Sequence, residues 1–323
     1  MPSTSGTIIV TGGAGFIGSH LVDSLLSDGR RVVCIDNFND FYDPAVKRAN
    51  VAAHIGRNLF TLIEADTCDL DAMRRAFDWH KPEQIVHLAA RAGVRPSVEQ
   101  PLLYLETNER GTMNLLECCR EFSVRSFIFA SSSSVYGVNS KVPFSVDDKI
   151  ALPISPYAAT KCAGELMCHT WHHLYGIRAA CLRFFTVYGP RQRPDLAIHK
   201  FARLMAADKE IPIYGDGSMR RDFTYIDDII GGVRSAMERD YPFDIFNLGN
   251  SNPISVNELV ALLEKHLGIT ARTVRKPVPP GDVPITYADI RHTIEKLDYR
   301  VTTPIDAGIG KFAQWFLKER AGR

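Results

Sequence analysis

Tyr157 and Lys161 are the residues of this sequence whose types and spacing best fit acid–base chemistry. Ser155 is a suitable helix N-cap and Pro156 suits the first helical position, so we expect a helix to begin here. Residues four apart share a helix face, which brings the Tyr157 phenol within reach of the Lys161 ammonium. An isolated phenol titrates near pH ~10, and a neighbouring cation favours phenolate. We therefore predict that Tyr157 is a general base.

Four consecutive serines supply a third candidate, Ser132. They follow the apolar run Ser126–Ala130, which is typical of a buried strand, so their hydroxyls should lie at a strand end. A hydroxyl there could bond a substrate oxygen and relay its proton, and we assign this role to Ser132. A Tyr-x-x-x-Lys spacing alone also fits a plain pair on a helix surface. The catalytic interpretation therefore depends on the elements that surround the pair.

The stretch Thr7–Leu26 (TIIVTGGAGFIGSHLVDSLL) contains the elements that would position this chemistry. A short apolar run precedes a glycine-rich turn, and apolar residues at helical spacing follow it. The regularly spaced glycines are Gly12, Gly15 and Gly18. Such a turn lets a pyrophosphate approach the backbone, and the N–H groups of the helix N-terminus, at Phe16 and Ile17, would bind it. A glycine pattern alone could be a bare turn, but strand, turn and helix together predict dinucleotide binding.

A carboxylate follows the next predicted strand. Arg31–Ile35 ends at Asp36, where an acid would accept hydrogen bonds from an adenosine ribose, with Asn37 beside it in the expected cofactor site. Asp36 would also repel a ribose 2′-phosphate, and no arginine follows it directly. NAD is therefore favoured over NADP as the cofactor.

Strand and helix patterns alternate through the first half of the chain. Further strands are expected at Leu59–Ala65, Gln84–Leu88, Ser126–Ala130 and Arg178–Phe185, and helices near Asp71–His80, Thr107–Phe122 and Pro156–Tyr175. This alternation predicts an α/β fold with a doubly wound parallel Rossmann sheet. Ligands of such sheets lie beyond the carboxyl ends of the strands, which here carry Asp66, Ala89, Ala90, the four serines and Thr186.

Past Gly189 the pattern changes to a basic loop, short turn-rich segments and further helices. We expect an NAD-binding domain over residues 1–188 that carries Ser132, Tyr157 and Lys161, and a smaller C-terminal α/β substrate domain over 189–323. A strand near 243–249 should return to the main sheet. Ser255 and Glu258 form a capping box that predicts the helix Val256–Leu267.

Composition excludes several classes of function. The chain has 38 Lys and Arg against 37 Asp and Glu, so its formal charge of +1 gives no reason to bind nucleic acid or a membrane surface. Its seven cysteines lack C-x-x-C spacing and its ten histidines show no metal-binding spacing, so we expect no metal site. Without a signal peptide or a long apolar run, a cytoplasmic location is expected.

Several segments resemble the extended short-chain dehydrogenases/reductases of the nucleotide-sugar epimerase and dehydratase group. The similarity extends over nearly the whole chain. It rests on TGGAGFIGSH (11–20), DNFND (36–40), HLAA (87–90), SSSSVYG (131–137), YAATK (157–161), RFFTVYGP (183–190), RRDFTYIDD (220–228) and PGDVPITYAD (280–289).

The resemblance implies roles for further residues. Asp66 and Thr67 are expected near the adenine, and Leu88, Ala89, Ala90 and Asn108 are expected to line the cofactor. Arg221 is expected to bind a UDP phosphate, with Tyr214 and Asp282 near the nucleotide. Proteins of this group commonly dimerise through a four-helix interface, so a homodimer is expected.

The reaction class is indicated by Ser133 and Ser134. Dehydratases of this group carry an Asp-Glu pair at these positions and decarboxylases usually carry a Glu, so the group that would take the C5 proton is missing here. Epimerisation needs only hydride abstraction from C4, rotation of the 4-keto sugar and hydride return. That reaction is therefore favoured.

The sugar is indicated by Thr186 and Arg193, since epimerases of UDP-glucose usually have Asn at the first position. The arrangement resembles UDP-glucuronate 4-epimerases, in which it implies that Ser132, Ser133, Ser134, Thr186 and Arg193 surround the sugar carboxylate. A guanidinium binds a carboxylate bidentately. We therefore expect conversion of UDP-glucuronate to UDP-galacturonate.

Four alternatives remain open at this point. The chain could epimerise neutral UDP-hexoses or N-acetylhexosamines, decarboxylate UDP-glucuronate, or be a non-catalytic NAD-binding sensor. Arg193 could be a loop residue that binds phosphate or solvent. Pro279 stands where many hexose epimerases carry an arginine for the nucleotide.

Overall fold

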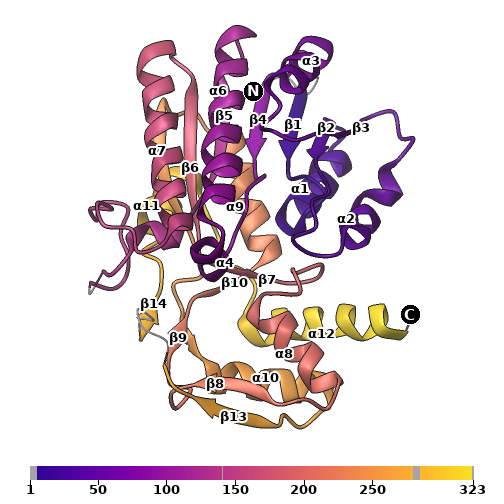
Figure 1. Cartoon of the computed structure of the whole chain (residues 1–323), viewed down its shortest axis with the longest axis vertical. Coiled ribbons are helices and arrows are strands. Elements are labelled where there is room, and N and C mark those ends of the chain that lie inside the picture. The colour runs from indigo at the N-terminus through magenta and orange to yellow at the C-terminus, as the bar shows by residue number, and fades with distance from the viewer. Residues whose placement is uncertain (1–5, 140, 279–283, 322–323) are drawn as a thin grey trace. The chain divides into compact units, whose positions relative to one another are not determined.

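The computed structural model describes residues 6–139, 141–278 and 284–321 (Figure 1). The chain forms two compact units. Unit 1 contains the chain up to Gly137 together with Asp148–Phe184 and Ile230–Phe246. Unit 2 contains Val138–Asp147, Phe185–Ile229 and the chain from Asn247 onward. The polypeptide therefore passes between the units at five points, after residues 137, 147, 184, 229 and 246.

A seven-stranded parallel sheet in the order β11-β6-β5-β4-β1-β2-β3 forms the centre of unit 1. The strands are β1 (Thr7–Thr11), β2 (Arg31–Asp36), β3 (Phe60–Glu64), β4 (Gln84–His87), β5 (Ser126–Ser132), β6 (Arg178–Phe184) and β11 (Phe243–Leu248). Strand order reverses where β1 lies beside β4, and ligands of such sheets bind beyond the strand ends at that point. The predicted doubly wound Rossmann fold is confirmed.

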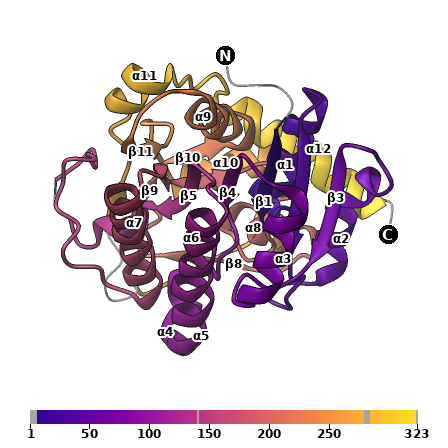
Figure 2. The ribbon, with the colours of Figure 1, turned by 90° about the horizontal axis from the view of Figure 1, so that it is seen from above.

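Helices cover both faces of this sheet (Figure 2). They are α1 (Phe16–Ser27), α2 (Pro44–Val51), α3 (Leu70–His80), α4 (Val94–Glu99), α5 (Pro101–Tyr104), α6 (Gly111–Glu121), α7 (Pro156–Tyr175) and α9 (Ile226–Glu238), with short turns η1 (Ala52–His54) and η3 (Ser133–Tyr136). On one face, α3, α6 and α7 share a core with the strands, to which they contribute Phe77, Leu116 and Cys168. On the other face, a side-chain hydrogen bond links α1 and α9, in which Arg234 Nη1 donates to Ser24 Oγ at 2.8 Å.

Local signals account for the helix boundaries. The Ser155 hydroxyl accepts a hydrogen bond from Ala158 N, and Gly176 ends α7 in the left-handed conformation, so the predicted bounds of this helix are confirmed. The helix expected at 107–122 instead begins as a π-helical turn, η2 (Leu105–Arg110), and continues as α6. The sequence analysis did not predict α2, α4 and α5.

The described part of unit 2 contains short strands and further helices, together with the first residues of α9 and the end of β11. Its strands are β7 (Thr186–Tyr188), β8 (Ile211–Tyr214), β9 (Arg220–Arg221), β10 (Phe223–Tyr225), β12 (Ile254–Ser255), β13 (Thr273–Lys276) and β14 (Ile285–Thr286). They pair as β10-β7, β12-β9-β14 and β13-β8. The helices are α8 (Ala197–Ala206), α10 (Val256–Leu267), α11 (Arg291–Leu297) and α12 (Ile305–Ala321). Helix α10 has the predicted capping box.

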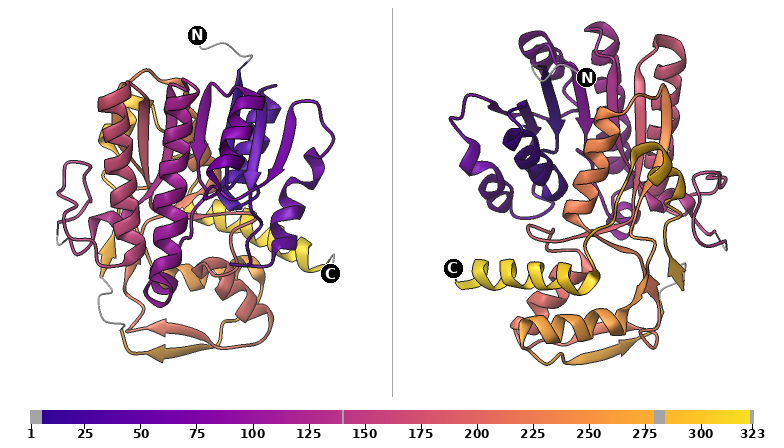
Figure 3. Two further views of the ribbon diagram at one scale, coloured as in Figure 1. Left: turned by 45° about the horizontal axis from the view of Figure 1, so that its top comes forward. Right: turned by 180° about the vertical axis from the view of Figure 1, so that it is seen from behind.

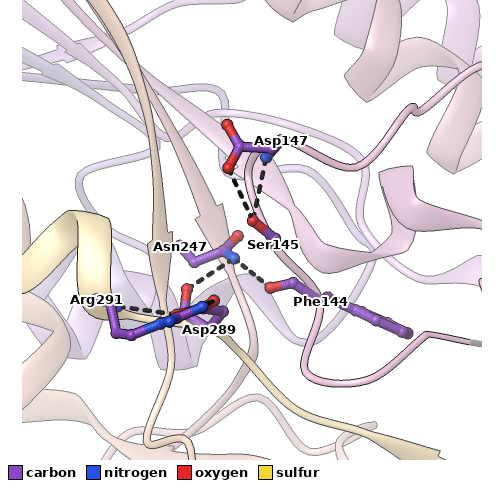
Figure 4. Close-up of polar contacts among 6 residues, drawn as sticks. All are labelled: Phe144, Ser145, Asp147, Asn247, Asp289 and Arg291. Atoms are coloured by element: carbon purple, nitrogen blue, oxygen red, sulfur yellow. Dashed lines mark hydrogen bonds and ion pairs between the residues drawn. The ribbon is translucent and has the colours of Figure 1, made fainter.

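The segment Val138–Asp147 lies in unit 2 although both neighbouring segments lie in unit 1. Phe144 N donates to Tyr287 O and Phe144 O accepts from Asp289 N, each at 2.9 Å. The buried Asn247 amide donates to the carbonyls of Phe144 and Asp289, at 2.8 and 3.1 Å (Figure 4). One side chain thus joins the segment to the chain that follows β14. Asp289 is also paired with Arg291.

Candidate active site

The glycine turn after β1 leaves no room for a side chain at Gly12 or Gly18. Gly12 has a φ of +65°, and a Cβ there would lie 2.7 Å from the backbone N of Ala89, beyond β4. A Cβ on Gly18 would lie 2.1 Å from Gly12 O. Gly15 is the N-cap of α1, and no side chain caps this helix. The first N–H groups of α1, beginning at Phe16 and Ile17, therefore suit an anionic ligand.

Asp36 ends β2 next to this turn. Its side chain accepts hydrogen bonds from Ala14 N at 3.2 Å and from Phe38 N at 2.9 Å. Burial raises the pKa of this carboxyl, and its backbone hydrogen bonds and the nearby Lys47 ammonium oppose the rise. The glycine turn and the predicted ribose-binding acid are thus joined directly.

A second group of predicted cofactor residues lies beyond β2 and β3. Asn37 Nδ2 donates to Asp66 Oδ2 at 2.8 Å, and Cys68 N donates to Asp66 Oδ1 at 2.8 Å. Although burial works in the other direction, these hydrogen bonds hold the pKa of Asp66 below its ordinary value. Thr67 is buried, and its carbonyl accepts from the Asn114 amide at 2.9 Å.

Asn108 links the loop after β4 to the helix of the catalytic pair. The loop begins with Leu88–Ala90, whose first N–H donates to Thr11 O at 3.1 Å. The Asn108 amide donates to Arg91 O and to Thr160 Oγ1, each at 3.0 Å, and its oxygen accepts from Arg91 N at 2.8 Å. Thr160 precedes Lys161 in α7. Asn108 therefore positions α7, and its contact with a cofactor remains a prediction.

Lys161 is buried on the face of α7 that also carries Tyr157. Its Nζ donates to Ala130 O at 2.7 Å and lies 5.9 Å from the centroid of the Tyr157 ring. Burial lowers the pKa of this ammonium to about 8, against the opposing influence of Cys168 and Glu165. The ammonium thus lies near the Tyr157 ring, and the catalytic role of the two residues remains a prediction.

Ser132 is the last residue of β5, two positions beyond the carbonyl that binds Lys161. Its hydroxyl donates to Ser134 Oγ and accepts from Ser134 N, both at 3.2 Å. Ser133 and Ser134 form the first half of η3 and are half-buried. The three serines thus form one polar turn at the carboxyl end of the central sheet.

The sequence analysis missed a buried ion pair behind this turn. Arg183 Nε and Nη2 bind the two Glu165 oxygens at 2.9 and 2.8 Å, and Ser131 Oγ donates to Glu165 Oε1 at 2.5 Å. The Arg183 guanidinium also lies 4.8 Å from the centroid of the Tyr136 ring. Glu165 follows Lys161 by one helical turn. That spacing, and an arginine inside the apolar run 179–184, indicate buried charges but do not identify them as partners.

The predicted substrate residues of unit 2 lie on separate short strands. Thr186 begins β7 and its N donates to Asp222 O at 3.1 Å. Arg221, on β9, precedes Asp222, and its Nη1 donates to Arg220 O at 2.9 Å. Tyr214 ends β8 in a different two-stranded sheet. The backbone hydrogen bond between Thr186 and Asp222 therefore brings Thr186 near Arg221.

Asp222 holds this part of unit 2 together. Its buried carboxylate accepts hydrogen bonds from the backbone N of Asn250, Ser251 and Ala288 at 2.7, 3.0 and 3.0 Å. Burial raises the pKa of the Asp222 carboxyl, while these hydrogen bonds oppose the rise. Asp282 and Pro279, the remaining predicted positions, lie outside the described residues.

Arg193 lies in a loop that is built around Gln192, a second residue missed by the sequence analysis. Gln192 is 2% exposed, and its amide donates to Val187 O at 3.0 Å and accepts from His199 N at 3.2 Å. The His199 Nδ1 donates to Gln192 O at 2.5 Å. Gln192 therefore ties the end of β7 to the first turn of α8, which fixes the backbone beside Arg193.

The Arg193 side chain forms a two-point ion pair within this loop. Its Nε is 3.0 Å from Asp195 Oδ1 and its Nη2 is 2.7 Å from Asp195 Oδ2. Although burial opposes the effect, this guanidinium holds the pKa of Asp195 below its ordinary value. The arginine that was predicted to bind a sugar carboxylate thus binds a carboxylate of the chain itself.

Neither a metal site nor a membrane span is found in the described ranges. No group of three or more His, Cys, Asp or Glu residues there could hold a metal ion. Likewise, none of the helices described for this chain combines the length and the apolar character needed to cross a membrane.

A family model, curated sequences and solved structures all relate this chain to NAD-dependent epimerases. The family model "NAD dependent epimerase/dehydratase family" matches residues 8–249. UDP-glucuronate 4-epimerase 4 of Arabidopsis thaliana is 42% identical over 334 residues, which cover 98% of this chain and 76% of the plant protein. UDP-glucuronic acid 4-epimerase of Bacillus cereus, solved with UDP-glucuronic acid and NAD, is 36% identical with a TM-score of 0.90, over 97% of this chain and 99% of that one. UDP-glucose 4-epimerase of Thermotoga maritima, solved with UDP-glucose, is 34% identical with a TM-score of 0.89, over the same shares.

Proposed function

Because the chain belongs to the NAD-dependent epimerase/dehydratase family, we propose that it converts UDP-glucuronate to UDP-galacturonate by inverting C4. The observation that carries this proposal is 42% identity, over nearly the whole chain, to a protein named for that reaction. The polar turn supports it, since Ser133 and Ser134 replace the carboxylates that elimination would require. In this proposal unit 1 binds the cofactor and provides the acid–base groups, and residues of unit 2 bind the UDP moiety.

The residues of unit 1 fit NAD, which supplies a hydride acceptor and donor when bound. The closed glycine turn and the uncapped N-terminus of α1 suit a pyrophosphate. Asp36 offers a carboxylate to the ribose, and its negative charge disfavours a 2′-phosphate there. Asp66 and Thr67 would lie toward the adenine.

Tyr157 removes the proton from the sugar 4-hydroxyl and later returns it. The buried Lys161 ammonium lies near the phenol and favours its ionised form. Ser132 bonds the same sugar oxygen and relays the proton. The hydrogen bond from Lys161 to Ala130 O connects these groups, because Ala130 and Ser132 belong to one strand.

The sugar carboxylate makes decarboxylation a possible side reaction, since the 4-keto form of a uronate is a β-keto acid. Such an acid loses CO₂ when its C5–carboxylate bond stands perpendicular to the carbonyl plane. Ser133, Ser134, Thr186 and Arg193 would hold the carboxylate nearer to that plane. Arg221 and Tyr214 bind the UDP moiety, together with Asp282.

A neutral UDP-hexose is the second candidate substrate. The similarity to the Thermotoga maritima UDP-glucose 4-epimerase supports it, at 34% identity over 97% of this chain. The pairing of Arg193 with Asp195 also supports it, because a guanidinium that is already neutralised does not demand a charged sugar.

The enzyme is a cytoplasmic homodimer in this proposal. Exposed leucines on α7 and α5 support a helical interface: Leu166 is 67% exposed, Leu174 58% and Leu102 80%. Figure 3 shows α6 and α7 side by side on the surface of unit 1. All seven cysteines are free thiols, which suits a reducing compartment. Light scattering on the purified protein, with L166E/L174E as the variant, tests the dimer.

Product analysis by NMR tests the reaction. Purified protein is incubated with UDP-glucuronate, and in parallel with UDP-glucose. UDP-galacturonate from the first and little change in the second are expected. UDP-galactose as the dominant product would instead make the chain a hexose epimerase. A UDP-pentose with released CO₂ would mean that the polar turn does not protect the β-keto acid.

A further inference from the structure

We infer that Asp195 is an internal competitor for the Arg193 guanidinium and sets how strongly the site prefers a uronate over a neutral hexose. The inference rests on the proposed function, in which Arg193 meets the sugar carboxylate. Asp195 is then a specificity-determining residue that needs no contact with the sugar.

The geometry of the pair carries the first step. Both Asp195 oxygens are used, against Nε and Nη2 of Arg193, at 3.0 and 2.7 Å. This two-point arrangement is the one by which arginine binds a ligand carboxylate. A sugar carboxylate that approaches Arg193 therefore meets a group of its own charge and chemistry already in place.

The rigidity of the loop carries the second step. Gln192 is buried and bonds to Val187 O and His199 N, while Gln192 O accepts from the His199 ring. Leu196 N donates to Arg193 O at 3.2 Å, which closes the loop over Asp195. The backbone on both sides of the pair is thus fixed. A ligand must compete for the guanidinium through side-chain movement and cannot draw the whole loop aside.

The side chains themselves have room for that movement. Arg193 is 18% exposed and Asp195 is 40% exposed, so the carboxylate lies at the solvent side of the pair. Asp195 can leave the guanidinium and become hydrated without stranding a buried charge. Displacement therefore carries a moderate cost, unlike the loss of a fully buried partner.

The two candidate ligands respond to Asp195 differently. A uronate must displace Asp195 or share Arg193 with it, so the aspartate weakens uronate binding. A neutral hexose offers no carboxylate to Arg193 and leaves the pair intact, so its affinity depends little on Asp195. Asp195 therefore reduces the preference of the site for a uronate over a neutral hexose.

The test is the Asp195→Asn variant, which keeps the size of the side chain and removes its charge. Holoenzyme is titrated with UDP-glucuronate and UDP-glucose by calorimetry, and KM is measured for each substrate that turns over. We expect the Kd for UDP-glucuronate to fall about fivefold and that for UDP-glucose to change less than about twofold.

The control is Asp298→Asn. Asp298 also pairs with an arginine two residues away, Arg300, at 3.1 Å, but in an exposed position of unit 2. Its φ of 52° is a conformation that asparagine adopts readily. This variant loses the same charge, and neither Kd should change. If the Kd values of Asp298→Asn and Asp195→Asn shifted by the same amount, the loss of net charge alone would be responsible. That result would overturn the inference.

A double-mutant cycle separates Asp195 from Arg193. In an Arg193→Ala background, Asp195→Asn should leave the ratio of the two Kd values unchanged, since there is no guanidinium to contest. Should Asp195→Asn alone raise the Kd for UDP-glucuronate, Asp195 orients Arg193 and the inference is wrong. Asp195→Ser, checked by circular dichroism, serves if the asparagine variant does not fold.

Failure of the proposed function is distinguishable from failure of this inference. A parent enzyme that makes only UDP-galactose refutes the proposed uronate reaction. A parent that makes UDP-galacturonate, with an Asp195→Asn variant whose two Kd values move together, refutes only the role of Asp195.

Discussion

Lys161 of unit 1 and Arg193 of unit 2 are both cations that we assign to the reaction, but the chain holds them differently. Lys161 is buried on a 20-residue helix, and its ammonium binds the carbonyl of a central strand. Arg193 lies in a loop, remains 18% exposed and pairs with an aspartate two residues along the chain. The long elements fix the acid–base groups, while the substrate residues stand on short strands and loops. A change at Tyr157 or Lys161 should therefore affect every substrate, and a change at Arg193 should discriminate between them.

The largest effect is expected for Tyr157→Phe. Loss of the phenolic base should lower kcat about 10³-fold for UDP-glucuronate and for any neutral UDP-hexose alike. Product formation by NMR measures it. Tyr175→Phe, at the far end of the same helix, is the control and should keep parental activity. If the Tyr157 variant kept a tenth of that activity, the general base would have to be sought elsewhere.

Glu165→Gln should cost about 3 kcal/mol of unfolding free energy, because it leaves Arg183 buried without a charged partner. Urea denaturation followed by circular dichroism gives the value. Glu117→Gln removes the carboxylate of an exposed pair with Arg120 and should cost under ~0.5 kcal/mol. Equal losses of unfolding free energy in the two variants would show that the buried pair stabilises the protein no more than the exposed pair does.

Arg193→Ala should raise KM for UDP-glucuronate about 30-fold while changing KM for UDP-glucose less than about twofold. The reason is that only the uronate offers a carboxylate to the guanidinium. Steady-state kinetics with both substrates measure the split, with Arg300→Ala as the exposed control. A parallel loss for both substrates would place Arg193 on the shared UDP moiety.

The smallest expected effect is a pH-dependent difference in unfolding free energy between the parent and Lys161→Met. Because burial lowers the pKa of Lys161 from 10.5 to about 8, the unfolded chain holds a proton that the folded chain lacks between these values. Lys161 thus lowers the unfolding free energy at low pH, and it lowers it less as the pH rises from about 8 to 10.5. Between about pH 7.5 and 9 the parent should gain about 1 kcal/mol relative to the methionine variant.

Urea denaturation of both proteins at the two pH values, without added cofactor, measures this difference. Comparison with the methionine variant cancels the titration of other groups. A parent that lost stability relative to Lys161→Met as pH rose would contradict a lowered pKa at this position.

Local signals made part of this structure predictable. Ser155 and Gly176 define α7, and Ser255 with Glu258 starts α10, because caps depend only on neighbours within one turn. The glycine turn and Asp36 were equally local to one βαβ unit. These features position the residues that we assign to the cofactor and to acid–base chemistry, and the sequence was informative there.

Features that depend on distant partners were not predictable. The spacing of Glu165 in its helix does not show that Arg183 and Ser131 both bind it, since the contact requires the register of β5 against β6. The pairing of Phe144 with Tyr287 and Asp289 joins segments far apart in the chain, and Asn247 has no motif around it. The sequence shows Asp195 two residues after Arg193, but the ion pair between them depends on the loop conformation that Gln192 stabilises.

The five crossings of the chain bear on how such enzymes can be diversified. Unit 2 is assembled from three separated stretches, the first of which is only Val138–Asp147. No single recombination breakpoint can exchange the whole unit for that of a relative, and no continuous gene fragment encodes it. Point changes and short loop replacements are therefore the simplest routes to new substrate preferences. The loop from Gly189 to Leu196, with Arg193 and Asp195 in one stretch, is a piece small enough to be replaced whole.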